Sequence, residues 1–388
     1  MQRIGVEERR ARLVRRHLLD AAARESSVAA VAEALVALHS TDPVTVYLSI
    51  LARADGLDPP AVERELYDTK TVVRMLGMRR TLFVVPRALR PVVQAGCTDE
   101  IAARERKRLL GWLATTPGID APAPWLREAE KAALAAVARV GEAATAEVAR
   151  AEPLLATPLE LGSGRWALTA SAGSRILPIL AAQGRLVRGR PRGTWISGQY
   201  RWALADDWLG EQQEPPPAAD ARAELVRAWL RSSGPGTETD LRWWTGLGAR
   251  PIREALAAVG AATVELDEGT GFVLAEDVEP TPAPAPSAAL LPTLDPTTMG
   301  WKERDWYLGA HAEVLFDRNG NAGPTVWWDG RVVGGWSQRR DGEIVYRLLE
   351  DVGSDAEAAV DAEAARVASW LGDVRFSPGF LPPFHRDL

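Results

Sequence analysis

The sequence of 388 residues predicts an α+β fold, with tandem winged helix-turn-helix modules followed by a small C-terminal antiparallel β-sheet or barrel with a closing helix. Three observations lead to this prediction. Short apolar helical segments followed by two strand-like segments recur at spacings of roughly 80 to 110 residues. A proline-rich stretch at 279–287 then marks a stiff connection. Beyond it, apolar segments alternate with Asn-Gly, Asp-Gly and Gly-Gly turns, which are typical of antiparallel hairpins.

Four segments follow from this organisation. A winged-helix-like module with the candidate active site is expected at 1–118, and a second module with a basic wing at 119–215. A third module is expected at 216–278 and a C-terminal β domain at 279–388. The division agrees with the length, because a chain of this size exceeds one ordinary hydrophobic core.

The first two modules differ in how regular their patterns are. In the first, Pro43 opens a helix over 44–53, and the β-prone stretch 78–85 lies directly between helix-like flanks. The second is the clearest copy. Its apolar periodicity predicts helices and a Gly- and Pro-containing basic hairpin, at 130–139, 145–155, 171–183 and 185–204.

The third module repeats the plan with an acidic turn. Glu265, Asp267 and Glu268 lie in its hairpin, and these charges repel DNA. We therefore expect this copy to serve as a scaffold or protein-packing module. Its helices and hairpin are expected at 221–232, 237–245, 250–259 and 262–274.

The C-terminal region alternates between strand-like segments and turns. One face of its last segment carries Ala359, Ala362, Val367 and Leu371, which predicts a helix that covers the sheet. The strands and this helix are expected at 311–316, 325–329, 331–336, 343–349 and 355–371.

Composition limits the classes of protein that fit. The chain is 46% hydrophobic and 25% charged, and it lacks both an apolar signal segment and the roughly 18 apolar residues that span a bilayer. Cys97 is its single cysteine, which excludes internal disulfides. We expect a cytoplasmic protein without a membrane association. The four histidines are scattered and no phosphate-binding glycine motif is present, so no metal and no cofactor are expected.

The acidic residues are unevenly distributed. The net charge is -6, yet no acid occurs between Asp68 and Asp99 or between Glu160 and Asp206. At 52 acids in 388 residues, the second window alone would on average contain about six. Two such windows favour contact with phosphate over a solvated face that lacks acids by chance. The second window contains Arg165, Arg175, Arg185, Arg188, Arg190, Arg192 and Arg201.

Polar side chains are concentrated in the segment Leu38-His39-Ser40-Thr41-Asp42-Pro43, between two helical stretches. An aspartate directly before a helix-opening proline is typical of an N-cap. His39 has two interpretations, a partly buried histidine bonded to backbone or a functional group at the helix junction. Ser40 lies between His39 and Thr41 and would point away from both if those two side chains share a face.

The stretch 34–53 around this motif resembles bacterial winged-helix proteins that include DNA glycosylases for alkylated bases and interstrand crosslinks. Segments 290–301 and 328–336 are similar to the C-terminal portion of the same family. Where the family has Gln-x-Gln before Asp-Pro, this chain has His39 and Thr41. The resemblance implies a monofunctional DNA glycosylase that hydrolyses the N-glycosidic bond of alkylated or crosslinked purines, in DNA repair and genotoxin resistance. Double-stranded DNA is the expected partner, and we expect a monomer.

The resemblance assigns candidate catalytic roles to the motif. An N7-alkylated purine is already a good leaving group, so the reaction needs a positioned water and stabilisation of a cationic sugar. His39 would accept a proton from the water near its ordinary pKa of about 6.5. Thr41 would supply a hydrogen bond, and Asp42 would either stabilise the sugar or only cap the helix.

DNA contacts are expected from two places. Segment 78–82 matches a Met-Arg-Gly-Thr-Leu stretch of the family, with Arg80 in place of glycine. Arg79 or Arg80 would bind a phosphate beside the lesion, or pair with Asp68 or Glu100. In the basic hairpin, aromatic residues would stack on bases or pack the hairpin against its own domain. The hairpin candidates are Arg188, Arg190, Arg192, Trp195, Tyr200 and Arg201.

Two other functions fit the sequence. A non-catalytic winged-helix DNA-binding protein, either a lesion binder or a transcription regulator, would agree with the replacement of both glutamines. Modules that serve protein contacts alone would agree with the acidic third hairpin.

Overall fold

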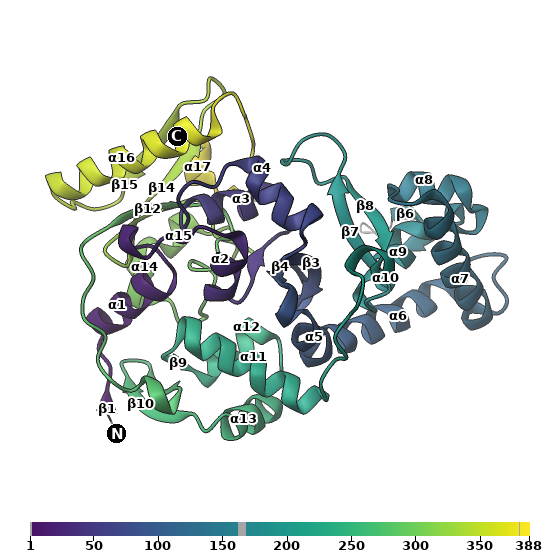
Figure 1. The fold of residues 1–388 in the computed structure, drawn as a ribbon, viewed down its shortest axis with the longest axis horizontal. Coiled ribbons are helices and arrows are strands. Elements are labelled where there is room, and N and C mark those ends of the chain that lie inside the picture. Colours follow the sequence, from purple (N-terminus) through teal and green to yellow (C-terminus); the bar gives the residue numbers. More distant parts are fainter. Residues whose placement is uncertain (1, 162–167, 380) are drawn as a thin grey trace.

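The computed structural model describes residues 2–161, 168–379 and 381–388. Figure 1 shows a main body and a smaller lobe, joined by the long helix α6 (Asp99–Leu113) and by the segment that leads to α11 (Ala218–Ser233). The lobe contains α7 (Pro122–Val140), α8 (Thr145–Ala151), α9 (Gly173–Ala182) and two hairpins. The other helices are α1 (Val6–Arg16), α2 (Val28–Ala34), α3 (Pro43–Leu51), α4 (Pro59–Glu63), α5 (Arg90–Val93), α10 (Ala205–Leu209), α12 (Glu238–Thr245), α13 (Ala249–Ala258), α14 (Asp305–Leu308), α15 (Ala312–Leu315), α16 (Ser354–Leu371) and α17 (Pro383–Arg386).

The strands form small, separate sheets. In the described residues, a three-stranded antiparallel sheet has the order β2 (Leu38–His39), β4 (Thr81–Pro86), β3 (Val72–Gly77). The lobe has the hairpins β5 (Pro158–Leu161)–β6 (Leu168–Ser171) and β7 (Leu186–Pro191)–β8 (Tyr200–Leu204). The C-terminal sheet is antiparallel, in the order β12 (Ala288–Leu291), β13 (Thr325–Trp328), β14 (Arg331–Gln338), β15 (Ile344–Leu348). A mixed sheet has the order β1 (Gln2–Arg3), β10 (Ala262–Leu266), β11 (Gly269–Val273), β9 (Gly236–Thr237).

Two of the large hydrophobic clusters combine residues that are distant in sequence. One joins the N-terminal 120 residues to 225–274 and 289–332, and the other joins them to 187–209 and 288–371. The lobe has a cluster of its own, built from 109–204. The main body therefore depends on contacts between the two ends of the chain.

The expected helices in the lobe and in 221–259 are present. Most of their ends are shifted by a few residues, but α7 begins at Pro122, well before the expected start at 130. The expected closing helix is α16, which covers the C-terminal sheet in Figure 1. The expected strand at 311–316 is wrong, because this segment is a helical turn that continues into α15. The fourth strand is β12, directly after the proline-rich stretch.

The acidic hairpin β10–β11 lies against the N-terminus. β1 pairs with β10, Arg3 binds Asp267 at 2.8 Å, and Arg9 binds Glu268 at 2.7 Å. Two of the three acids of this hairpin, Asp267 and Glu268, are therefore paired with arginines of the same chain.

A buried polar network links α3 to the segment after β12. Arg53 and Asp295 are both fully buried, and their two guanidinium-to-carboxylate bonds measure 2.6 and 2.9 Å. Asp295 also accepts bonds from Ser49 Oγ and from the backbone N–H of Thr297. The remaining Arg53 donors bind Ser49 O, His17 O and Thr297 Oγ1. We call Ser49, Arg53, Asp295 and Thr297 the α3 network; all five guanidinium N–H groups have acceptors.

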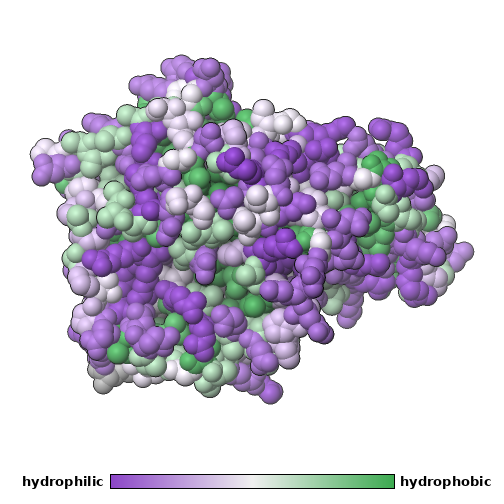
Figure 2. Space-filling model, viewed as in Figure 1, coloured by the Kyte–Doolittle hydropathy of each residue, from purple (hydrophilic) through white to green (hydrophobic). Residues whose placement is uncertain are grey.

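The surface is predominantly polar. Hydrophilic residues cover most of the face in Figure 2, and hydrophobic residues form small separate groups. Of the large hydrophobic side chains that the structure describes, Val140, Leu168 and Val314 are exposed. Within the described ranges, no helix is long and apolar enough to cross a membrane.

Candidate active site

The motif lies where β2 ends and α3 begins. His39 pairs with Phe83 across the sheet, and the backbone N–H of Ser40 donates to Leu82 O. Side chains alternate along a strand, so His39 and Ser40 project to opposite faces. Ser40 accepts a hydrogen bond from Arg74, whereas the ring of His39 contacts Phe83. The expectation that Ser40 points away from its neighbours is therefore confirmed at His39.

His39 is enclosed. Its side chain is 7% exposed, its ring centroid lies 5.5 Å from that of Phe83, and Nδ1 is buried without a hydrogen-bond partner among the described residues. Burial, with a smaller contribution from the positive charge of Arg79, lowers the pKa of His39 to about 3. The expected titration near pH 6.5 is wrong, because the site is too apolar to hold an imidazolium. His39 is a neutral ring at physiological pH.

Thr41 and Asp42 have different surroundings. Thr41 is exposed, and its hydroxyl makes no hydrogen bond with the part of the chain that the structure describes. Asp42 is buried and caps α3 by accepting from Val44 N at 3.1 Å. Its second oxygen accepts from Gly379 N at 2.9 Å. The capping interpretation of Asp42 is confirmed, and the cap leaves the neighbouring Thr41 at the surface.

Arg79 and Arg80 form the turn between β3 and β4. Both have left-handed backbones, with φ of 53° and 61°, which favour glycine and explain the glycine of the related motif at position 80. Arg80 is exposed and pairs with Glu105 at 3.0 Å, and not with Asp68 or Glu100. Arg79 stacks on Trp243 at 3.9 Å, and burial, with the charge of Arg304, lowers its pKa to about 10. Among the described residues Arg79 has no acidic partner.

Three of the hairpin arginines are neutralised. Arg190 pairs with Asp68 at 2.9 Å and Glu63 at 3.3 Å, Arg192 with Glu147 at 2.6 Å, and Arg201 with Glu142 at 3.8 Å. Arg188 differs, because it stacks on Trp202 at 4.7 Å and has no ion pair with a described residue. Burial, and then the charge of Arg74, lower the pKa of Arg188 to about 10. Arg165 lies outside the described residues.

The two aromatic candidates of the hairpin have different positions. Trp195 is buried and lies 4.6 Å from Tyr47 of α3 and 5.7 Å from Trp370 of α16, measured between ring centroids. Its expected contact with DNA is therefore corrected to a packing role, because the ring anchors the hairpin to the main body. Tyr200 is partly buried and stacks against Arg74 at 4.3 Å.

Sequence reasoning missed Arg74 as a member of this site. It is 4% exposed, and it donates from Nε to Ser40 Oγ at 2.6 Å and from Nη1 to the Tyr67 hydroxyl at 2.8 Å. The available signal was an arginine at an inward position of a β-prone stretch within an acid-free window. A buried arginine in such a place needs partners from elsewhere in the fold.

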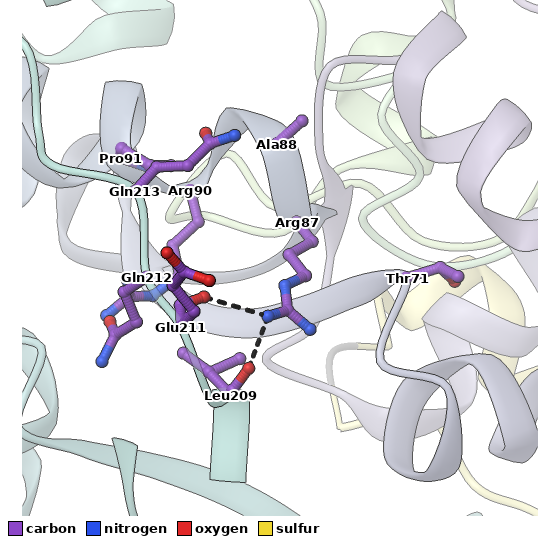
Figure 3. Close-up of a pocket in the computed structure, with 9 residues that line it drawn as sticks. All are labelled: Thr71, Arg87, Ala88, Arg90, Pro91, Leu209, Glu211, Gln212 and Gln213. Carbon is purple, nitrogen blue, oxygen red and sulfur yellow. Dashed lines mark hydrogen bonds between the residues drawn. The ribbon is translucent and has the colours of Figure 1, made fainter. Parts of the chain in front are cut away.

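A cavity of about 730 Å³ is separate from the motif. It lies between the segment after β4 and the segment after α10. Figure 3 shows the Arg87 guanidinium bonded to the carbonyl oxygens of Leu209 and Glu211 in its wall. No residue of segment 38–43 lines it, so this cavity does not define the site.

Comparisons with known proteins agree on one family. The family model described as "DNA glycosylase AlkZ-like" matches residues 32–370. The Streptomyces sahachiroi DNA glycosylase AlkZ has a similar fold, with a TM-score of 0.74 and 21% sequence identity over 95% of this chain and 98% of that chain. No curated protein sequence matches the chain significantly.

Proposed function

The chain belongs to the AlkZ-like DNA glycosylase family, and from this premise we propose that it is a monofunctional glycosylase, acting as a monomer on double-stranded DNA. Its substrates are N7-alkylated purines. Purines that are crosslinked between the strands through the same N7 atom are larger substrates of the same chemical class. The observation that carries the proposal is the exposed Thr41 hydroxyl at the start of α3. Arg79, whose charge acts on His39, and Arg188, whose pKa is lowered by burial and by the charge of Arg74, have no acidic partners among the described residues.

The proposed chemistry needs little acid catalysis. Alkylation makes the base cationic, so the remaining requirements are a water near C1′ and stabilisation of the sugar cation. We assign the water to Thr41 and the electrostatic stabilisation to Asp42, whose charge lies beside it in the chain. His39 ends β2 and precedes Thr41 by two residues, and Thr41 lies in the bend that leads into α3. As a neutral ring it supplies a hydrogen bond to the water or to Thr41, and it does not titrate near pH 7.

We also propose that 119–215 and 216–278 are winged-helix modules. The support is their element order, since three helices precede an antiparallel hairpin in each: α7, α8, α9 before β7–β8, and α11, α12, α13 before β10–β11. In this proposal the second module, with Arg188 in its hairpin, faces DNA. The third supports the fold, because its acidic turn is bound by Arg3 and Arg9. The proposed segments keep the boundaries given by the sequence.

Base release tests the proposal. A duplex that carries one N7-methylguanine is incubated with excess protein, and free base is measured by chromatography. We expect release by the wild-type chain, and a loss of about 100-fold in T41V, because the isosteric valine removes only the hydroxyl. T41V should unfold like the wild type, since that hydroxyl has no partner among the described residues. T69V, at another threonine outside the helices and strands, is the matched control and should retain release.

One observation favours a second function. His39 is enclosed and resists protonation, which suits a structural residue in a non-catalytic lesion-binding protein. Tight binding of the modified duplex without any base release would select this alternative. Release that is unaffected in T41V would retain the enzyme and remove the proposed role of Thr41.

A further inference from the structure

Five side chains on the Ser40 face of the sheet form what we call the donor cluster: Ser40, Tyr47, Arg74, Arg188 and Tyr200. They come from the end of β2, from α3, from β3 and from both strands of the basic hairpin. Arg74 is at the centre, since it bonds Ser40, stacks against Tyr200, and lies within electrostatic range of Tyr47 and Arg188.

Donors exceed acceptors in this cluster. Nη2 of Arg74 and the hydroxyls of Tyr47 and Tyr200 are buried, and none has a hydrogen-bond partner among the described residues. Arg188 likewise has neither a hydrogen bond nor an ion pair with them. Burial raises the pKa of both tyrosines, so their hydroxyls stay protonated and act as donors. Native proteins rarely leave several buried donors without acceptors, unless a ligand supplies them.

The cluster also lacks a counter-ion. Two arginines lie close enough for the charge of Arg74 to lower the pKa of Arg188. The nearest acids have other partners: Asp42 binds the backbone N–H groups of Val44 and Gly379, and Glu63 binds Arg190. Uncompensated buried charges of one sign are costly, and an anion removes that cost.

We propose that the donor cluster binds one phosphate group of the DNA backbone, at the nucleotide whose sugar lies against Thr41. The assignment rests on the proposed function, which places a nucleotide there. Ser40 connects the two places along the chain, because it lies between His39 and Thr41 while its side chain, on the face opposite to that of His39, accepts a hydrogen bond from Arg74. A phosphate matches the chemistry, since its oxygens accept several bonds at once and guanidinium groups bind them in pairs.

Arg188 and Arg190 provide a matched pair for the test. They lie two residues apart on β7, and only Arg190 has acidic partners. Binding is measured on a duplex with one tetrahydrofuran abasic nucleotide, in a series where single linkages around it are replaced in turn by neutral methylphosphonate. We expect one linkage whose neutralisation weakens wild-type binding about tenfold. The same replacement should have no further effect in R188Q and should keep its full effect in R190Q.

The salt dependence of DNA affinity provides a second measurement. Loss of one phosphate contact should reduce the slope of log affinity against log salt concentration by about 0.9 in R188Q. Y200F should also abolish the effect of that linkage, although it removes only a hydroxyl without a partner in the described chain. The proposal would be overturned if the effect of each substitution on binding simply added to the effect of the methylphosphonate at every linkage. The cluster would then be structural. These experiments measure DNA binding and not base release. A negative binding result would therefore leave the proposed glycosylase function intact. The binding result can also be interpreted if the protein releases no base.

Discussion

Two buried polar clusters lie beside α3, and they differ in how many of their donors have acceptors. In the α3 network, all five N–H groups of Arg53 have acceptors, and Asp295 accepts four bonds. In the donor cluster, Arg74 Nη2 and two tyrosine hydroxyls have none among the described residues. A satisfied cluster stabilises the fold by itself. A cluster short of acceptors lowers stability until a ligand completes it, so burial alone does not distinguish structure from function.

Breaking the satisfied cluster should have the largest effect. D295N leaves Arg53 buried without a full negative partner, so we expect the free energy of unfolding to fall by about 3 to 5 kcal/mol. Urea unfolding measures this change. As a comparison, D267N removes the exposed ion pair between Arg3 and Asp267 and should lower the free energy of unfolding by less than about 1 kcal/mol. DNA affinity per folded molecule should not change in D295N, and a specific loss of affinity would mean that the network also serves the site.

Acid should destabilise the protein through two buried histidines, His17 and His39. Burial holds the pKa of both His17 and His39 at about 3, while the unfolded chain takes up protons near pH 6.5. The unfolded state therefore binds more protons below pH 6.5, and the free energy of unfolding falls as the pH drops from 6.5 towards 3. At pH 5 the loss is about 2 kcal/mol for each histidine.

Urea unfolding at pH 7, 6 and 5 measures this dependence, and H39Q should remove about half of it. The rate of base release, corrected for the folded fraction, should show no inflection near pH 6.5 because His39 stays neutral. An inflection of the base-release rate near pH 6.5 would instead show that His39 acts as a general base.

The turn between β3 and β4 should give the smallest effect. R80G relieves a left-handed backbone and loses an exposed ion pair, so we expect stability to rise by about 0.5 to 1 kcal/mol. R79G relieves a similar φ but loses the stack on Trp243, so its stability should fall. Thermal unfolding of both variants measures the difference. A destabilised R80G would show that the Glu105 pair outweighs the backbone strain.

Local patterns gave correct predictions where local forces decide. Helical periodicity located α3, α8, α9 and α16, turn residues located both hairpins, and the aspartate before Pro43 identified a cap. The prediction for 311–316 was wrong because a short segment with four apolar residues does not distinguish a strand from a helical turn. The burial of His39 could not be predicted from the sequence, because it depends on Phe83 and on elements that are distant in sequence.

The donor cluster shows more clearly that local sequence patterns do not predict contacts between distant residues. Tyr47, Arg74 and Tyr200 are separated by long stretches of sequence, and no spacing rule brings them together. The acid-free windows identified arginines that have no acid nearby in the sequence. Only the fold shows that Arg188 is one of them and that Arg190 is neutralised by Asp68 and Glu63.

The difference between the two clusters is tested most directly by removing one buried hydroxyl from each. S49A and Y200F are compared for the free energy of unfolding and for affinity to the abasic duplex. We predict that S49A loses about 1 to 2 kcal/mol of stability with unchanged affinity, because its hydroxyl bonds Asp295. Y200F should keep or gain stability and bind DNA about tenfold more weakly. A Y200F protein that loses stability and keeps its affinity would contradict the account.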